Sequence, residues 1–177
     1  MLQPDTYALL RRMLEVASTD EELEIVLRRF QAVYDANKDS TDRDDLFDAA
    51  WAMSGLAGLY ARLHEPFLAE HAYLESIKRF EAIDMPLNAA AICEALAQFL
   101  DTQGRTAEAQ AQLRDEITYL SILGSPDELV LWVEEELDHY RLTGELVEAC
   151  NYRWYLPCDV DGYSFSAIEG PDRQDDG

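Results

Sequence analysis

Apolar residues recur every three to four positions along most of this chain, the spacing that places them on one face of an α-helix. Residues 5–17 show the pattern first, and residues 19–36 repeat it. The apolar positions of these two segments are Leu9, Leu10, Met13, Leu14, Ala17, Leu23, Val26, Leu27, Phe30, Val33 and Tyr34. The stretch 37–45 is polar and has no such period, so we interpret it as a linker.

Helix-starting and helix-ending residues divide the remaining chain into further segments. Thr19 and Glu22 have the spacing of a capping box, in which each side chain accepts a hydrogen bond from the other's backbone. Pro66, Pro86 and Pro126 occur where a first helical turn tolerates proline. We therefore expect eight helices, at about 5–17, 19–36, 42–63, 66–83, 86–103, 105–123, 125–143 and 145–154.

Small residues dominate the segment 46–63. Gly55 and Gly58 would each cost about 1 kcal/mol relative to alanine inside a helix. A neighbouring helix that approaches closely would explain that cost, so we predict such an approach at both glycines.

Three helix ends repeat at a spacing of 40 residues. Arg62-Leu63-His64, Thr102-Gln103-Gly104 and Leu142-Thr143-Gly144 stand at this interval, and so do Ala69, Ala109 and Ala149. A small residue five positions after the turn lets the second helix pack closely against the first. A period of this length predicts stacked helical hairpins.

The repeating unit resembles the tetratricopeptide repeat. Its first copy reads Leu56-Ala57-x-x-Tyr60-x-x-Leu63-His64, followed by Ala69 and Tyr73. Later copies keep Leu96-Ala97, Leu100, Gly104, Ala109 and Leu113, and then Tyr140, Gly144 and Ala149. The resemblance covers residues 46–154, with a unit longer than the family's usual length of about 34 residues. It implies a protein-binding scaffold with a concave face and no catalytic residues.

The C-terminal segment differs from the helical pattern. Residues 154–168 are rich in aromatic side chains and contain Asp161-Gly162, a hairpin-turn signal, while Pro157 argues against a central strand. Residues 169–177 have the composition of a disordered end. We expect a single domain composed of an N-terminal helical pair at 1–37, a repeat array at 42–156 and an irregular cap with an acidic tail at 157–177.

The chain is strongly acidic, with 36 Asp and Glu against 14 Lys and Arg and a net charge of −22. This charge disfavours binding to nucleic-acid phosphates and to anionic membranes. Residues 1–125 hold 22 acidic and 11 basic side chains, and residues 126–177 hold 14 and 3, so each part carries −11. Two interpretations remain open: the charge keeps the protein soluble, or it steers a basic partner toward the chain.

Candidate reactive groups are few. Glu135 and His139 lie one helical turn apart and could share a metal ion, although an acidic, solvated helix face with an ion pair explains them better, because no HExxH arrangement occurs. Three cysteines without a CxxC pair favour reduced thiols in a cytoplasm, and Cys93 falls in an apolar run that predicts a core position. No phosphate-binding loop and no GxSxG motif occur, and we expect no cofactor.

The tryptophans and the C-terminal aromatic residues have two interpretations. Trp51, Trp132 and Trp154 fit a helical core, or they anchor a partner. Tyr155 and the aromatic residues around it cap the last apolar face of the stack, or they form an exposed binding surface.

These observations predict an all-α stack of antiparallel helical hairpins, a tetratricopeptide-like solenoid. The leading functional hypothesis is a non-enzymatic bacterial adaptor, chaperone or immunity protein of the cytoplasm that binds a basic protein. Its candidate contact residues are Glu134, Glu135, Glu136, Asp138, Trp132, Trp154 and Tyr155. The alternatives are a DNA mimic that blocks a nucleic-acid-binding protein, and a metal-dependent enzyme that uses Glu135 and His139.

Overall fold

The computed structural model describes residues 2–122, 127–144 and 146. All regular secondary structure within this part of the chain is α-helical, which confirms the all-α prediction. The helices are α1 (Pro4–Val16), α2 (Asp20–Asn37), α3 (Arg43–Arg62), α4 (Pro66–Ala82), α5 (Pro86–Thr102), α6 (Thr106–Ile122) and α7 (Asp127–Thr143). The expected eighth helix, the aromatic cap and the acidic tail lie outside the described residues.

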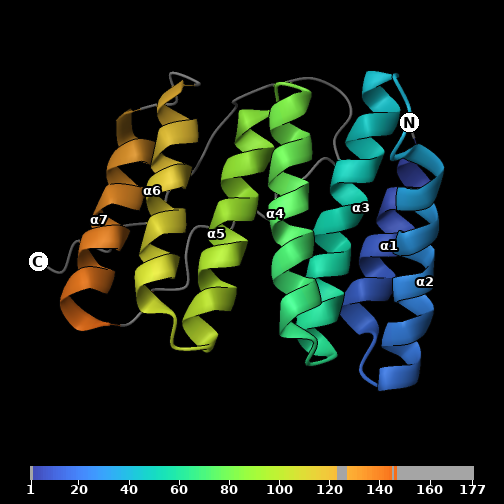
Figure 1. Ribbon diagram of the computed structural model, residues 1–177, viewed down its shortest axis with the longest axis horizontal. Helices are drawn as coiled ribbons and strands as arrows, with labels where there is room; N and C mark the ends of the chain where they lie inside the picture. The colour runs from blue at the N-terminus through green and yellow to red at the C-terminus, as the bar shows by residue number, and fades with distance from the viewer. Residues whose placement is uncertain (1, 123–126, 145, 147–177) are drawn as a thin grey trace, which may run out of the picture.

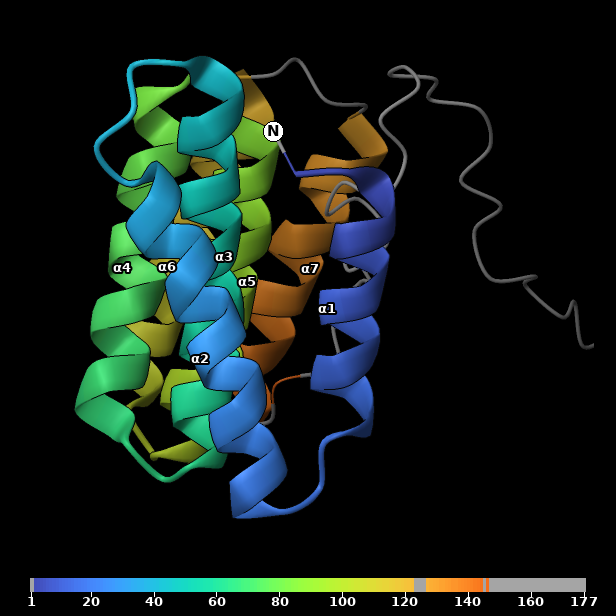
Figure 2. The ribbon, with the colours of Figure 1, turned by 90° about the vertical axis from the view of Figure 1, so that its right-hand side faces the viewer.

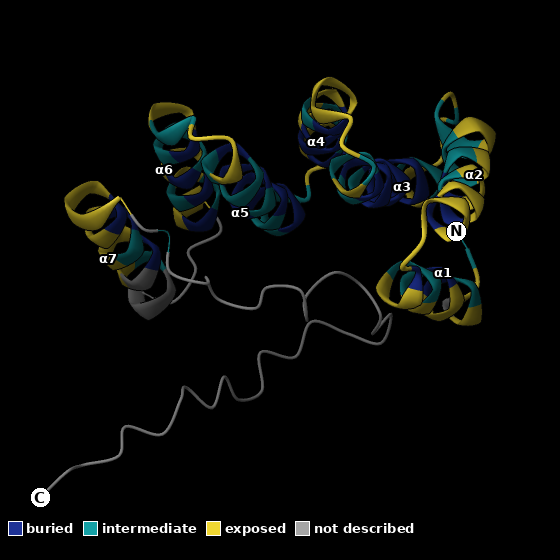
Figure 3. Ribbon diagram, turned by 90° about the horizontal axis from the view of Figure 1, so that it is seen from below, coloured by how far each residue is buried: buried dark blue, intermediate teal, exposed yellow. Residues whose placement is uncertain are grey.

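The helices form a stack of antiparallel hairpins in which each helix packs on its neighbours in sequence (Figure 1). Seen along the helix axes, α2, α4 and α6 form an outer row, and α3 and α5 lie inside it (Figure 3). The helices α1 and α7 lie at opposite ends on the inner side, and the perpendicular view agrees (Figure 2). The fold is therefore a curved stack with α7 at one end of its described part.

The helices begin where the sequence predicts. The backbone N–H of Glu22 donates to Thr19 Oγ1 at 3.3 Å, and Thr19 N–H donates to Glu22 Oε2 at 3.0 Å, which completes the capping box. Asp42 caps α3 by accepting from two backbone N–H groups. Pro66 and Pro86 stand at the first turns of α4 and α5. The linker covers 38–42, within the polar stretch 37–45, because α2 continues to Asn37 and α3 begins at Arg43, close to the expected start.

The turns repeat at the same interval as the sequence pattern. His64, Gly104 and Gly144 have positive φ angles of 61°, 71° and 72°. After the first two, Glu65 N–H donates to the Tyr60 carbonyl at 2.9 Å and Arg105 N–H to the Leu100 carbonyl at 3.0 Å. This bond closes the end of a helix with a left-handed residue. The helices that follow, 66–82 and 106–122, are offset by 40 residues at both ends.

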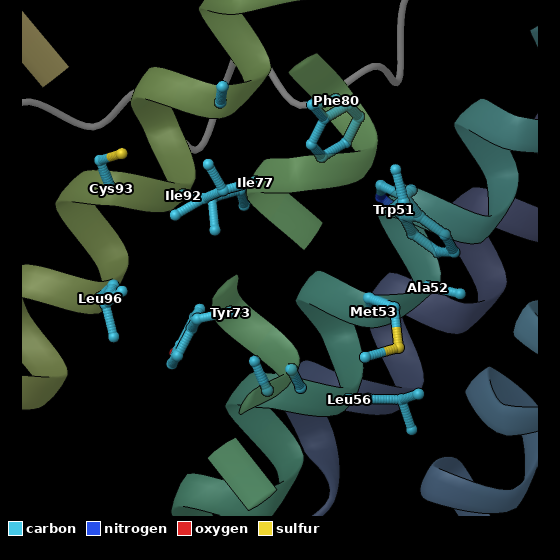
Figure 4. Packing of buried hydrophobic residues seen from close by; sticks show 14 of the residues in the cluster. Trp51, Ala52, Met53, Leu56, Tyr73, Ile77, Phe80, Ile92, Cys93 and Leu96 are labelled. Carbon is cyan, nitrogen blue, oxygen red and sulfur yellow. The ribbon is translucent and has the colours of Figure 1, made fainter. Parts of the chain in front are cut away.

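The core lies between α3, α4 and α5. Tyr73, Ile77 and Phe80 of α4 point into the space between the two flanking helices (Figure 4). Trp51 and Cys93 are 8% and 1% exposed, so both are core residues as one interpretation of the sequence expected. Within the described residues, no helix is long and apolar enough to cross a membrane.

Hydrogen bonds to inner carboxylates attach the terminal helices to the stack. The Tyr7 hydroxyl of α1 donates to Asp48 of α3, whose other carboxylate oxygen accepts from Leu2 N–H at 2.6 Å. At the other end, the Tyr140 hydroxyl of α7 donates to Asp101 Oδ1 at the end of α5, at 2.5 Å. Each end helix is thus fixed by a tyrosine that reaches a carboxylate on an inner helix.

The two glycines of α3 differ in their surroundings. A Cβ atom added to Gly55 would lie 2.1 Å from a ring carbon of Phe30, whose side chain is 1% exposed. Gly55 therefore permits the close approach of α2, as predicted. A Cβ atom at Gly58 would meet nothing within 4 Å, so the prediction of a close approach was wrong there.

We expect Gly55→Ala to lower the free energy of unfolding by about 1–3 kcal/mol, because the new methyl group displaces a packed ring. The matched control is Gly58→Ala, which should raise it by about 0.5–1 kcal/mol through helix propensity alone. Urea denaturation followed by circular dichroism measures both. Equal effects of the two substitutions would contradict the packing described for Phe30.

Candidate functional site

The helix α7 distributes its acidic residues over two faces. Glu134, Glu135 and Asp138 are exposed to solvent, whereas Glu136 is half-buried. Asp138 forms an exposed ion pair with Arg141 at 2.9 Å, a type of contact that contributes little to stability. The run that reads as one acidic surface in the sequence is therefore three surface carboxylates and one that faces inward.

The other predicted contact residues lie outside the part of the chain whose side chains are described. Trp132 belongs to α7, but its side chain is not described, and Trp154 and Tyr155 lie outside the described residues. Glu135 and His139 are both exposed on α7. No group of three histidine, cysteine or acidic side chains within the described part of the chain is arranged to hold a metal ion.

Three glutamates on consecutive helices meet where α5, α6 and α7 pack together. Glu94 of α5 is 7% exposed and accepts a hydrogen bond from Gln98 Nε2 at 3.2 Å. Glu116 of α6 is 1% exposed, and neither of its carboxylate oxygens has a hydrogen-bond partner. Glu136 of α7 has one buried oxygen, Oε1, that also lacks a partner. We call Glu94, Glu116 and Glu136 the acidic junction.

The environment of the acidic junction favours protonated carboxyl groups. Burial raises the pKa of Glu116 well above its ordinary value, and the negative charges of Glu94 and Glu136 raise it further. Burial also raises the pKa of Glu136 to about 7. The pKa of the nearby Cys93 thiol is raised as well, first by burial and then by acidic groups that include Glu116. At neutral pH the junction therefore tends to hold protons that solvated glutamates would release.

The preceding hairpin shows what the fold needs at these positions. The equivalent positions one repeat earlier, 40 residues before each glutamate, are occupied by Ser54, Ser76 and Leu96. Ser76 is fully buried, and its hydroxyl donates to the Ala50 carbonyl at 2.9 Å. The Ser54 hydroxyl donates to the Trp51 carbonyl at 2.7 Å, and Leu96 is a core residue. We call these three residues the neutral junction.

The contrast between the two junctions shows that helix packing does not require carboxyl groups at these places. The neutral junction satisfies its hydroxyl groups with backbone carbonyls and carries no charge. The acidic junction leaves three buried oxygen atoms without donors, although such atoms normally find partners. An unpaired buried polar group costs about 1–3 kcal/mol, so the acidic junction carries a cost that the neutral junction avoids.

Sequence reasoning missed the acidic junction, although a signal was present. Ala109, Leu113, Glu116 and Leu120 follow the three-to-four spacing of one helix face, and the structure buries all four. A glutamate on an otherwise apolar stripe predicts a buried charge. The run of acids in α7 drew attention to composition instead of to the face that each residue occupies.

Comparison with models of known protein families, with curated proteins and with solved structures found no match. The function must therefore be argued from the two sets of carboxyl groups. The exposed set on α7 can bind cationic side chains, and the buried set can hold protons.

We expect Glu116→Gln to raise the free energy of unfolding by about 1–3 kcal/mol at pH 8 and by much less at pH 5. The sign follows from linkage: a carboxyl group whose pKa is raised by folding stabilises the folded state at low pH. That stabilisation is lost as the pH rises toward the pKa of the folded state. Glutamine keeps the shape of the side chain and has no proton to lose.

Urea denaturation at pH 5, 6, 7 and 8 measures this effect. The matched control is Glu134→Gln on the exposed face of α7, which should change stability by less than about 0.5 kcal/mol at every pH. If Glu116→Gln and Glu134→Gln gave the same pH dependence, the buried carboxyl group would not be its source.

Proposed function

We propose that this protein is a non-enzymatic binding protein that recognises a basic segment of another protein through the exposed carboxylates of α7. The observation that carries the proposal is the exposure of Glu134, Glu135 and Asp138 within about one turn of this end helix. A bacterial adaptor, chaperone or immunity protein in the cytoplasm would use such a surface.

The use of the basic residues supports this proposal. Arg43 donates two hydrogen bonds to the Ile83 carbonyl, and Arg62 donates to the Leu14 and Ala17 carbonyls. Arg105 pairs with both Glu70 and Glu108. These guanidinium groups stabilise the chain's own turns and helices, so the excess of acidic side chains is left for interactions outside the chain.

Repeating hairpins also favour protein binding over catalysis. A stack in which each hairpin packs on the next presents an extended, curved surface, and such surfaces bind other chains. The resemblance to tetratricopeptide repeats suggests the same use. Charge complementarity would then select a basic partner and accelerate its association at low salt.

We expect a triple variant, Glu134→Gln, Glu135→Gln and Asp138→Asn, to bind a synthetic arginine-rich peptide at least about tenfold more weakly than the wild type at 50 mM salt. The loss of three surface charges removes local attraction without disturbing the core. Fluorescence anisotropy of the labelled peptide measures the affinity, and a second titration at about 0.5 M salt should reduce the difference because salt screens exposed charges.

The matched control removes the same charge from another place: Glu21→Gln, Glu24→Gln and Asp39→Asn, all exposed on or next to α2. This control should bind the peptide almost as well as the wild type. If both triple variants lost affinity equally, the net charge alone would attract the peptide, and α7 would not be the binding site. The α7 variant and the control can then be compared in capture of the native partner.

A further inference from the structure

We propose that the acidic junction is a proton-binding site that holds α7 on the stack. With a proton bound between α6 and α7, the helix α7 docks against α5 and α6; when the proton leaves to solvent, α7 separates from them. This inference goes beyond the proposed function, since it concerns the docking of α7 in the protein alone.

The acidic junction lacks hydrogen-bond donors for three of its oxygen atoms. Both oxygens of Glu116 and Oε1 of Glu136 are buried acceptors without donors. A proton that binds one of these carboxylates gives a neutral acid, whose O–H group is a donor for a neighbouring acceptor. One proton thereby removes one buried charge and gives the junction a donor in place of a charged acceptor. No other co-reactant is needed, because the proton comes from water and returns to it.

The acidic groups around Glu116 make the packing of α7 depend on a bound proton. The groups that act on the Glu116 carboxyl are Glu94 from α5 and Glu136 from α7, and both are acidic. The Cys93 thiol of α5 lies close enough to be affected by Glu116, and burial keeps it protonated. Two or three ionised carboxylates in this buried space would repel one another across the contact between α6 and α7.

The helix α7 is the element that can separate from the stack when the proton is lost. Among its described side chains, three are buried: Val133, Leu137 and Tyr140. By contrast, α5 buries nine residues, from Asn88 to Leu100. Besides its apolar contacts, α7 is attached by the hydrogen bond between Tyr140 and Asp101. The docking of α7 therefore depends on whether the junction beneath these three side chains is neutral.

Linkage sets the expected size of the effect. A released α7 exposes Glu116 to water, where its pKa returns to the ordinary range of glutamate. Between that value and the pKa of the docked state, the ratio of released to docked α7 rises tenfold for each pH unit per proton. Below about pH 7, Glu136 contributes a second proton, because its pKa when docked is about 7.

Amide hydrogen exchange of the full chain, followed by NMR from pH 5 to 8.5 in EDTA, tests the proposal. After correction for intrinsic rates, the protection of the Val133 and Leu137 amides should fall as the pH rises above 7, by up to about tenfold per pH unit while Glu116 stays protonated in the docked state. These amides should also be at least about tenfold less protected than those of Leu56 and Leu59 in α3, which marks α7 as an independent unit.

Glu116→Gln should abolish the pH dependence of α7 protection above pH 7, while Glu134→Gln should retain it. If Glu116→Gln folds poorly, Glu116→Ser reproduces the residue found in the neutral junction and serves the same purpose. The Cδ resonance of Glu116 in the wild type should keep the chemical shift of a protonated acid at pH 7.

Three results would overturn the proposal. The first is α7 protection equal to that of α3 at every pH, which would mean that α7 never separates alone. The second is an unchanged slope in the Glu116 variant. The third is recovery of α7 protection at pH 8.5 on addition of Ca²⁺ or Zn²⁺ to EDTA-free wild type but not to the variant, which would identify a metal site instead.

Discussion

No helix of this protein can bury its own apolar face, and this constraint determines the whole architecture. Helices of 13 to 20 residues are marginal in water by themselves, so each must pack on the helices before and after it. The helix α4 shows the result, with Tyr73, Ile77 and Phe80 filling the space between α3 and α5. The end helices α1 and α7 have fewer neighbours, and hydrogen bonds from Tyr7 and Tyr140 to inner carboxylates supplement their packing.

One backbone arrangement carries two different chemistries at its junctions. The neutral junction is uncharged, because its serine hydroxyls donate hydrogen bonds to backbone carbonyls. The acidic junction has carboxyl groups at the equivalent positions. The acidic residues behind the net charge of −22 are therefore not all exposed on the surface. Some acidic groups face solvent, some pair with arginines, and a few are buried where their ionisation opposes packing. The groups that face solvent, including Asp138 with its exposed Arg141 partner, are the ones available to another protein.

Signals within single helical turns predicted the helices well. The packing of individual side chains was harder to predict, because it depends on contacts between residues far apart in the sequence. Pro66 and the capping box at Thr19 act within a single turn, so their positions fixed helix starts directly. The two glycines of α3 look alike in sequence, but only Gly55 faces the ring of Phe30, 25 residues away. Glu136 was grouped with its acidic neighbours because the run hides which face each residue occupies. A helix turns about 100° per residue, so adjacent acids can point to solvent and to the interior.

The packing of each helix on its sequence neighbours has a consequence for how the chain acquires its structure. The extensive contacts join α2 to α3, α3 to α4, α4 to α5 and α5 to α6, and none of these pairs is separated by a long stretch of chain. Such local topology favours rapid folding, because little loop entropy is lost before contacts form. During synthesis, the first hairpins can assemble while later residues are still inside the ribosome. The helix α7 would then be the last described element to dock, onto a surface that the earlier hairpins have already completed.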